Sequence, residues 1–100
     1  MFVVLYRWKL KAGREAAFQE GWRRLTLEIR EKGGLGSRLH KAEDKTWLAY
    51  AQWKDRETWE AARERRVIDE QAATLMREAV EIRFPDVFMN VVEDLLLHEF

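Results

Sequence analysis

Residues 36–53 read GSRLHKAEDKTWLAYAQW, and this stretch carries the strongest structural signal in the chain. Two alternating runs flank the polar pair Glu43-Asp44, a pattern typical of a β-hairpin. A two-residue turn at this pair would place Arg38 opposite Ala49 and His40 opposite Trp47. Because side chains alternate between the faces of a strand, one face is expected to hold Arg38, His40, Trp47, Ala49, Ala51 and Trp53. The other face would then hold Leu39, Leu48 and Tyr50.

The residues before the hairpin predict a strand followed by a helix. Residues 2–10 alternate in two registers, and the start of this segment is apolar on both faces, which favours a strand. From Arg14 the period changes to that of a helix, and the apolar residues follow at spacings of four, three and four: Phe18, Trp22, Leu25 and Ile29. Gly33-Gly34 is expected to end this helix.

The residues after the hairpin predict a broken helix and a last strand. Asp55 suits the N-cap of a helix that runs through Trp59 and into the basic residues 63–66. A second helical stripe is expected to end at Phe84-Pro85 and consists of Ile68, Ala72, Leu75, Ala79 and Ile82. Residues 86–97 alternate loosely and predict the last strand, which closes in an exposed leucine triplet.

This order of elements predicts one α+β domain over residues 1–100 with a ferredoxin-like, split βαβ layout. Its four-stranded antiparallel sheet would carry the helices on one face. Several strands are apolar on both faces, and one layer of helices covers only one of them. A large apolar face in water is unusual for a monomer. We therefore expect a homodimer in which two sheets pack face to face.

The composition excludes several classes of protein. The chain has 100 residues and no Cys, which excludes disulfides, a thiolate nucleophile and Cys-based metal sites. Its 18 basic residues balance 18 acidic ones, so the field that attracts nucleic acid or anionic membranes is missing. No apolar run approaches the roughly 20 residues of a transmembrane helix. We expect a cytoplasmic domain that binds neither nucleic acid nor membrane.

Three segments together resemble the antibiotic biosynthesis monooxygenase family of the dimeric α+β barrel superfamily. They are YRWKLKAGREAAF at 6–18, the hairpin at 36–53, and WKDRETWEAA at 53–62. The resemblance implies a homodimer with a pocket in each subunit between the helices and the sheet. It implies cofactor-independent oxygenation of a small aromatic or quinol-like molecule. The alternative is a non-catalytic dimer of the same fold that binds a small hydrophobic molecule or has a structural role.

Other members of the resembled family open heme oxidatively with an Asn, a Trp and a His. Tyr6 stands at the matching strand position, and that strand contains no Asn. The Trp position falls near Ala62, and no His lies between His40 and His98. The sequence therefore argues against heme, and we expect neither a cofactor nor a metal. His98, near the end of the chain, is expected to be exposed.

Arg38 and His40 are the candidate catalytic residues. At positions i and i+2 of one strand they share a face, where a cation could hold a substrate oxyanion and the imidazole could accept its proton. The resulting carbanion-like species can react directly with dioxygen. The alternative is that both side chains are solvated or lie in the dimer interface. Ser37 has no acidic partner at a readable spacing, so a hydrolytic triad has no support.

The excess of aromatic residues supplies the candidate substrate-binding residues. Flat aromatic walls suit a planar conjugated ligand, and Tyr and Trp also offer a hydrogen-bond donor. The candidates are Tyr6, Trp22, Tyr50 and Trp59. Large aromatic residues at these spacings are also typical of a core, and the sequence leaves both interpretations open.

Overall fold

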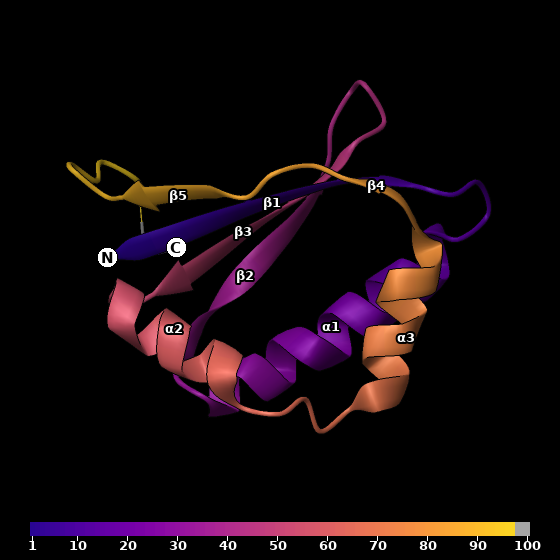
Figure 1. The fold of residues 1–100 in the computed structure, drawn as a ribbon. Helices are drawn as coiled ribbons and strands as arrows, with labels where there is room; N and C mark the ends of the chain where they lie inside the picture. The colour runs from indigo at the N-terminus through magenta and orange to yellow at the C-terminus, as the bar shows by residue number, and fades with distance from the viewer. Residues whose placement is uncertain (98–100) are drawn as a thin grey trace.

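The computed structural model describes residues 1–97, which form an α+β fold with three helices on one side of a sheet (Figure 1). In chain order the elements are β1 (Phe2–Leu10), α1 (Glu15–Glu31), β2 (Gly34–Lys41), β3 (Trp47–Trp53), α2 (Arg56–Glu64), α3 (Glu70–Ala79), β4 (Val80–Arg83) and β5 (Val87–Asn90). His98 lies outside the described residues. Within residues 1–97, none of the helices is long and apolar enough to cross a bilayer.

The sheet is antiparallel throughout, as the predicted ferredoxin-like layout requires. Its order is β2-β3-β1-β4, and β5 also pairs with β1. β4 and β5 follow one another along the same edge of β1: β4 lies opposite residues 8–10 and β5 opposite residues 2–5. The last strand, expected over residues 86–97, is present only over Val87–Asn90, and β4 is an additional strand on the same edge of β1.

This additional strand corrects the predicted end of the last helix. The helical stripe was expected to continue to Ile82, but α3 ends at Ala79 and residues 80–83 form β4. The Lys11 amide donates to the carbonyl of Ala79 at 2.8 Å, so pairing with β1 begins there. Pro85 has no N–H to donate, which accounts for the gap between β4 and β5.

The β2–β3 hairpin has a different register from the one its turn residues suggested. Ala42 donates its amide to the carbonyl of Thr46 at 2.8 Å, and Lys45 has a φ of 73°. The loop is therefore residues 43–45, a three-residue hairpin loop whose last residue is left-handed. This extra residue places Arg38 opposite Tyr50 and His40 opposite Leu48.

A shift of one residue moves every side chain of a strand to the other face. The prediction that Arg38 and His40 share a face with Trp47 and Ala49 is therefore wrong. On the helix-covered side, Ala49 lies opposite Leu39 and Tyr6. Arg38 and His40 lie on the uncovered side, and both are exposed.

Two of the helices begin at aspartate N-caps. The Asp55 carboxylate accepts from the Thr58 amide at 2.7 Å, which confirms the N-cap predicted for α2. Asp69 accepts from the Ala72 amide at 3.0 Å and caps α3. Helices α1 and α3 approach closely at Gly21, because a Cβ there would lie 2.6 Å from the carbonyl oxygen of Ala72.

The core lies between the helices and the sheet, in two clusters bridged by one tyrosine. The first cluster is Phe2, Val4, Trp53, Trp59 and Ala62, and the second is Trp8, Phe18, Ala49 and Ala79. Tyr6 packs against both. Trp47 and Met76 pack against the second cluster, but the small residues Ala49, Ala51 and Ala73 leave a space beside it. That opening is the site described next.

Candidate functional site

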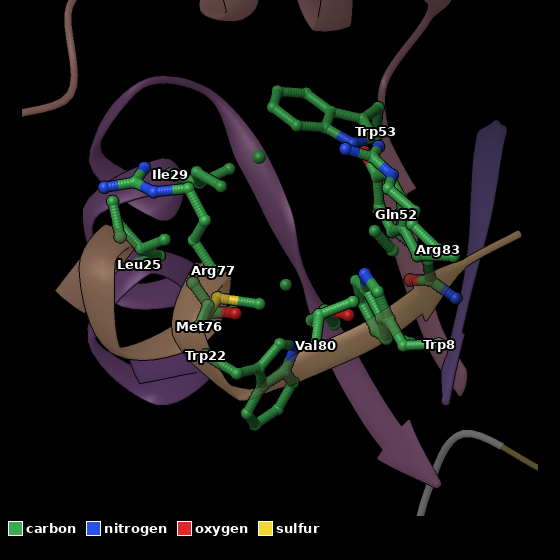
Figure 2. Close-up of a pocket in the computed structure, with 18 residues that line it drawn as sticks. Trp8, Trp22, Leu25, Ile29, Gln52, Trp53, Met76, Arg77, Val80 and Arg83 are labelled. Atoms are coloured by element: carbon green, nitrogen blue, oxygen red, sulfur yellow. The ribbon is translucent and has the colours of Figure 1, made fainter. Parts of the chain in front are cut away.

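A cavity of about 530 Å³ lies between the helix-covered face of the sheet and helices α1 and α3 (Figure 2). Its volume lies within the range typical of small-molecule sites. Figure 2 shows side chains from the helices and from the sheet on opposite sides of it: Trp22, Leu25 and Met76 against Trp8, Gln52 and Trp53. Small residues line the part of the wall that stays open: Gly34, Gly36, Ala49, Ala51 and Ala73.

Aromatic rings form much of the cavity wall. Tyr6 and Trp8 are stacked on β1, with ring centroids 5.8 Å apart and an interplanar angle of 15°. Phe18 of α1 packs edge-on against Trp8 at 5.0 Å and holds it from behind. The stacked pair presents a flat surface, which favours a planar ligand over a bulky one.

Tyr6 carries a hydroxyl whose proton is available to a ligand. The indole Nε1 of Trp59 donates to its oxygen at 3.4 Å, so that oxygen already acts as an acceptor. Burial raises the pKa of Tyr6 above its ordinary value, although the hydrogen bond from Trp59 acts in the opposite direction. The hydroxyl is therefore neutral at physiological pH and can donate.

The charged side chains that line the cavity are both cationic. Arg77 of α3 and Arg83 of β4 line it, and its lining within residues 1–97 includes no Asp, Glu or His. Arg83 is paired with Asp86 at 3.1 Å, whereas Arg77 donates to the neutral hydroxyl of Thr74. The cavity is consequently better suited to a ligand that carries negative charge than to a cation.

Two polar atoms of the cavity wall are buried and lack partners. Within the described residues, the hydroxyl of Ser37 and the indole Nε1 of Trp53 have no hydrogen bond. The register set by the three-residue hairpin loop turns Ser37 to the cavity side, opposite Ala51, and a β-bulge at Gly34–Gly36 lies on its N-terminal side. Buried polar groups normally find a partner, so these two atoms call for an explanation.

The residues proposed from the sequence are divided between two faces of the sheet. Tyr6 and Trp22 line the cavity, and Trp59 lies behind Tyr6 as its hydrogen-bond donor. Tyr50 lies on the opposite face, where it lines a second hollow beside residues 89–96. Arg38 and His40 lie on that face too, so the geometry gives their catalytic role no support.

Sequence reasoning missed four polar residues of the cavity lining: Thr26, Ser37, Arg77 and Arg83. Ser37 was considered only as a nucleophile, and its face depends on the hairpin register, which the turn residues did not predict correctly. Arg83 falls in β4, which the helical period concealed. Among the described residues, no group of three or more His, Cys, Asp or Glu side chains could hold a metal ion.

Several solved structures share this fold although their sequence identity to this chain is low. The cofactor-independent oxygenase SnoaB from Streptomyces nogalater superposes with a TM-score of 0.77 and 15% identity, covering 94% of this chain and 95% of its own. Rv0793 from Mycobacterium tuberculosis gives a TM-score of 0.75 and 11% identity, covering 95% and 98%. A Nitrosomonas europaea protein provisionally named as an antibiotic biosynthesis monooxygenase gives 0.73 and 21%, covering 93% and 100%.

A comparison with curated proteins gave no significant match. The family model of the antibiotic biosynthesis monooxygenases matches residues 1–81, which include the hairpin, helices α1 to α3 and most of the cavity lining. The chain therefore belongs to the antibiotic biosynthesis monooxygenase family.

Proposed function

We propose that the chain binds a small, flat aromatic or quinol-like molecule in the cavity and oxygenates it with dioxygen, without a cofactor. The observation that carries the proposal is the cavity itself, which combines stacked aromatic walls with cationic side chains and a protonated Tyr6. Family membership supports the same reaction class. SnoaB, which shares the fold, is described as a cofactor-independent oxygenase.

The charges around the cavity favour a substrate that reacts as its anion. An activated phenol or anthrone loses a proton to give an enolate, and Arg77 and Arg83 lower the energy of that negative charge. Because no carboxylate or imidazole of the described residues lines the cavity, solvent accepts the proton. The rate is then expected to rise with pH along the substrate's own ionisation.

The reaction balances without an external reductant. The enolate carbon forms a bond to one atom of dioxygen, and the outer oxygen takes up a proton to give a hydroperoxide. Loss of the remaining C–H proton expels the outer oxygen as water and leaves a carbonyl. Overall, a CH₂ group and O₂ give C=O and H₂O, so the electrons of two C–H bonds reduce dioxygen. The proposed role of Tyr6 is to hydrogen-bond the substrate oxygen while charge develops on it.

Oxygen uptake with a panel of anthrones and naphthohydroquinones tests this proposal. We expect one O₂ consumed per product and one labelled oxygen retained in the product from ¹⁸O₂. Tyr6→Phe removes the donor and is expected to lower kcat by about 10- to 100-fold. Tyr50→Phe is the matched control, because the same change on the other sheet face should leave kcat unchanged.

Measuring ligand binding beside oxygen uptake separates binding from catalysis. Ligands that bind in the cavity but consume no oxygen in any member of the panel would contradict the oxygenase proposal. That result would favour a non-catalytic binding domain, the alternative to which the lack of a cavity-lining carboxylate or imidazole among residues 1–97 points. Equal loss of kcat in Tyr6→Phe and Tyr50→Phe would contradict the proposed role of Tyr6.

We further propose that the chain acts as a homodimer joined through the uncovered sheet face. That face carries apolar side chains left partly exposed, among them Leu5, Leu48, Ile82 and Val87. Two copies packed about a twofold axis would cover the same residues in each. The cavity opens on the helical side, so this interface leaves it accessible.

A further inference from the structure

We propose that Ser37 and Trp53 form a polar end of the cavity that recognises an oxygen-bearing edge of the ligand, a carbonyl or phenolic oxygen. This inference rests on the proposed function, because it specifies the ligand of the same cavity. It starts from the two polar atoms that the folded chain buries without satisfying, the Ser37 hydroxyl and the Trp53 indole Nε1.

The two side chains are neighbours on one face of the β2–β3 pair. Ser37 lies opposite Ala51, and Trp53 follows two residues later on the same side of β3. Such diagonal neighbours lie about 7–8 Å apart at the backbone, within reach of one another's long side chains. Both residues line the cavity, so a single ring system can contact both.

The chemistry of the two groups specifies the ligand. Indole Nε1 is a donor only, and a serine hydroxyl can donate as well as accept. A ligand atom that satisfies both must therefore be an acceptor. Burying such groups without partners costs stability. A ligand oxygen would remove that cost on binding, whereas a hydrocarbon of the same shape would leave it unrelieved.

The local backbone supports a built site rather than a packing defect. The three-residue hairpin loop, with its left-handed Lys45, sets the register that turns Ser37 inward; with a two-residue loop, Ser37 would lie opposite Tyr50 on the outer face. Gly36 has a φ of 110°, a conformation that glycine adopts readily and other residues rarely do. The hairpin register thus brings a hydroxyl to the β2–β3 side of the cavity, beside Ala49, Ala51 and Trp53.

Equilibrium dialysis with 9,10-anthraquinone and anthracene tests the inference. The two tricycles share a carbon skeleton, and only the first carries oxygens. Its carbons 9 and 10 are already carbonyl carbons, so it cannot form the enolate that reacts with dioxygen, and binding is read without turnover. We expect the wild type to prefer anthraquinone. Ser37→Ala and Trp53→Phe should each weaken anthraquinone binding by about three- to tenfold and leave anthracene binding within twofold.

Thermal unfolding of ligand-free Ser37→Ala gives a second, independent reading. Removing a hydroxyl that has no partner should leave the melting temperature equal or raise it. A clearly lower melting temperature would overturn the inference, because the hydroxyl would then stabilise the fold. Equal losses for both tricycles, or no loss for either, would also overturn it.

These outcomes are distinct from failure of the proposed reaction. If the variants selectively lose anthraquinone binding and the wild type consumes no oxygen, the oxygenase proposal is contradicted and the polar end is supported. Oxygen uptake by the wild type, together with variants that lose binding of both tricycles equally or of neither, would do the reverse. A wild type that binds neither tricycle would overturn both the polar end and the proposed ligand class.

Discussion

Arg38 and His40 are exposed on the face of the sheet that the helices leave uncovered. A side chain on that face is separated from the cavity by the sheet itself. We expect Arg38→Ala and His40→Ala to keep kcat within about twofold of the wild type, the usual range for surface changes. Oxygen uptake with the best substrate of the panel measures this. Tyr6→Phe serves as the positive control.

A tenfold or greater loss of kcat in either variant would contradict this prediction and show that the reaction depends on the uncovered face of the sheet. The sequence could not decide this point, because the face of each β2 residue depends on the length of one hairpin loop. Glu43-Asp44 suggested two residues, whereas Lys45 adopts the left-handed conformation that makes the loop three residues long. Tyr6 lies on a strand whose alternation no such loop interrupts, and its side chain lines the cavity.

At the scale of elements, the connection between α2 and α3 is anchored to α1 through one carboxylate. Glu28 accepts from the amides of Ile68 and Asp69 at 3.1 and 2.8 Å and from the ammonium of Lys32 at 2.8 Å. Arg24 adds a bidentate pair to Asp69. These contacts fix the start of α3, whose residues Ala73, Met76 and Arg77 line the cavity.

The anchoring makes stability depend on the ionisation of Glu28. Desolvation alone would raise its pKa, but the hydrogen bonds from Lys32, Asp69 and Ile68 lower it below the ordinary value. A lowered pKa in the folded state contributes stability above the ordinary pKa of glutamate, and this contribution is lost as the pH falls through the folded-state pKa. Glu28→Gln is therefore expected to reduce the free energy of unfolding by about 1–3 kcal/mol at pH 7 and by less at pH 3.

Urea unfolding of both proteins at the two pH values measures the difference. Glu20→Gln is the matched control on the same helix, because Glu20 pairs with Arg23 where both side chains are well exposed. Its effect should stay within about 0.5 kcal/mol. A Glu28→Gln effect of the same size at both pH values would show that the carboxylate charge does not hold the loop.

The helices and strands could be predicted from the sequence where one apolar periodicity continues along the whole element. α1 follows its apolar stripe, and α2 begins at the cap residue that its sequence suggested. The exception is β4, since Ala79 and Ile82 fit a helical spacing equally well. What makes residues 80–83 a strand is pairing with Trp8, Lys9 and Leu10, a contact between segments about 70 residues apart that no local pattern records.

At the scale of the whole molecule, the uncovered sheet face distinguishes a monomer from a dimer. Val87 of β5 lies opposite Leu5 on that face and is 48% exposed, and Ile82 is 43% exposed. The sequence predicted this surplus of apolar residues, because several strands are apolar on both faces and one layer of helices covers only one face of the sheet. It could not locate the surplus exactly, since the hairpin register decides which β2 and β3 residues join it.

We expect the wild type to have twice the 12.0 kDa mass of one chain in light scattering after size exclusion. Val87→Glu should shift it to the mass of a monomer, because a carboxylate buried in an apolar interface loses its hydration without gaining a partner. Since Val87 is half exposed in the isolated chain, the same change should leave the monomer folded, which circular dichroism can verify.

Leu27→Glu is the control that makes the result specific to the sheet face. Leu27 is 50% exposed on α1, away from the sheet, and the substitution adds the same charge to a similar apolar side chain. If both variants remain dimers, the interface lies elsewhere; if both become monomers, net charge rather than the sheet face governs association. A monomeric Val87→Glu variant that still oxygenates substrate would place the whole reaction within one chain.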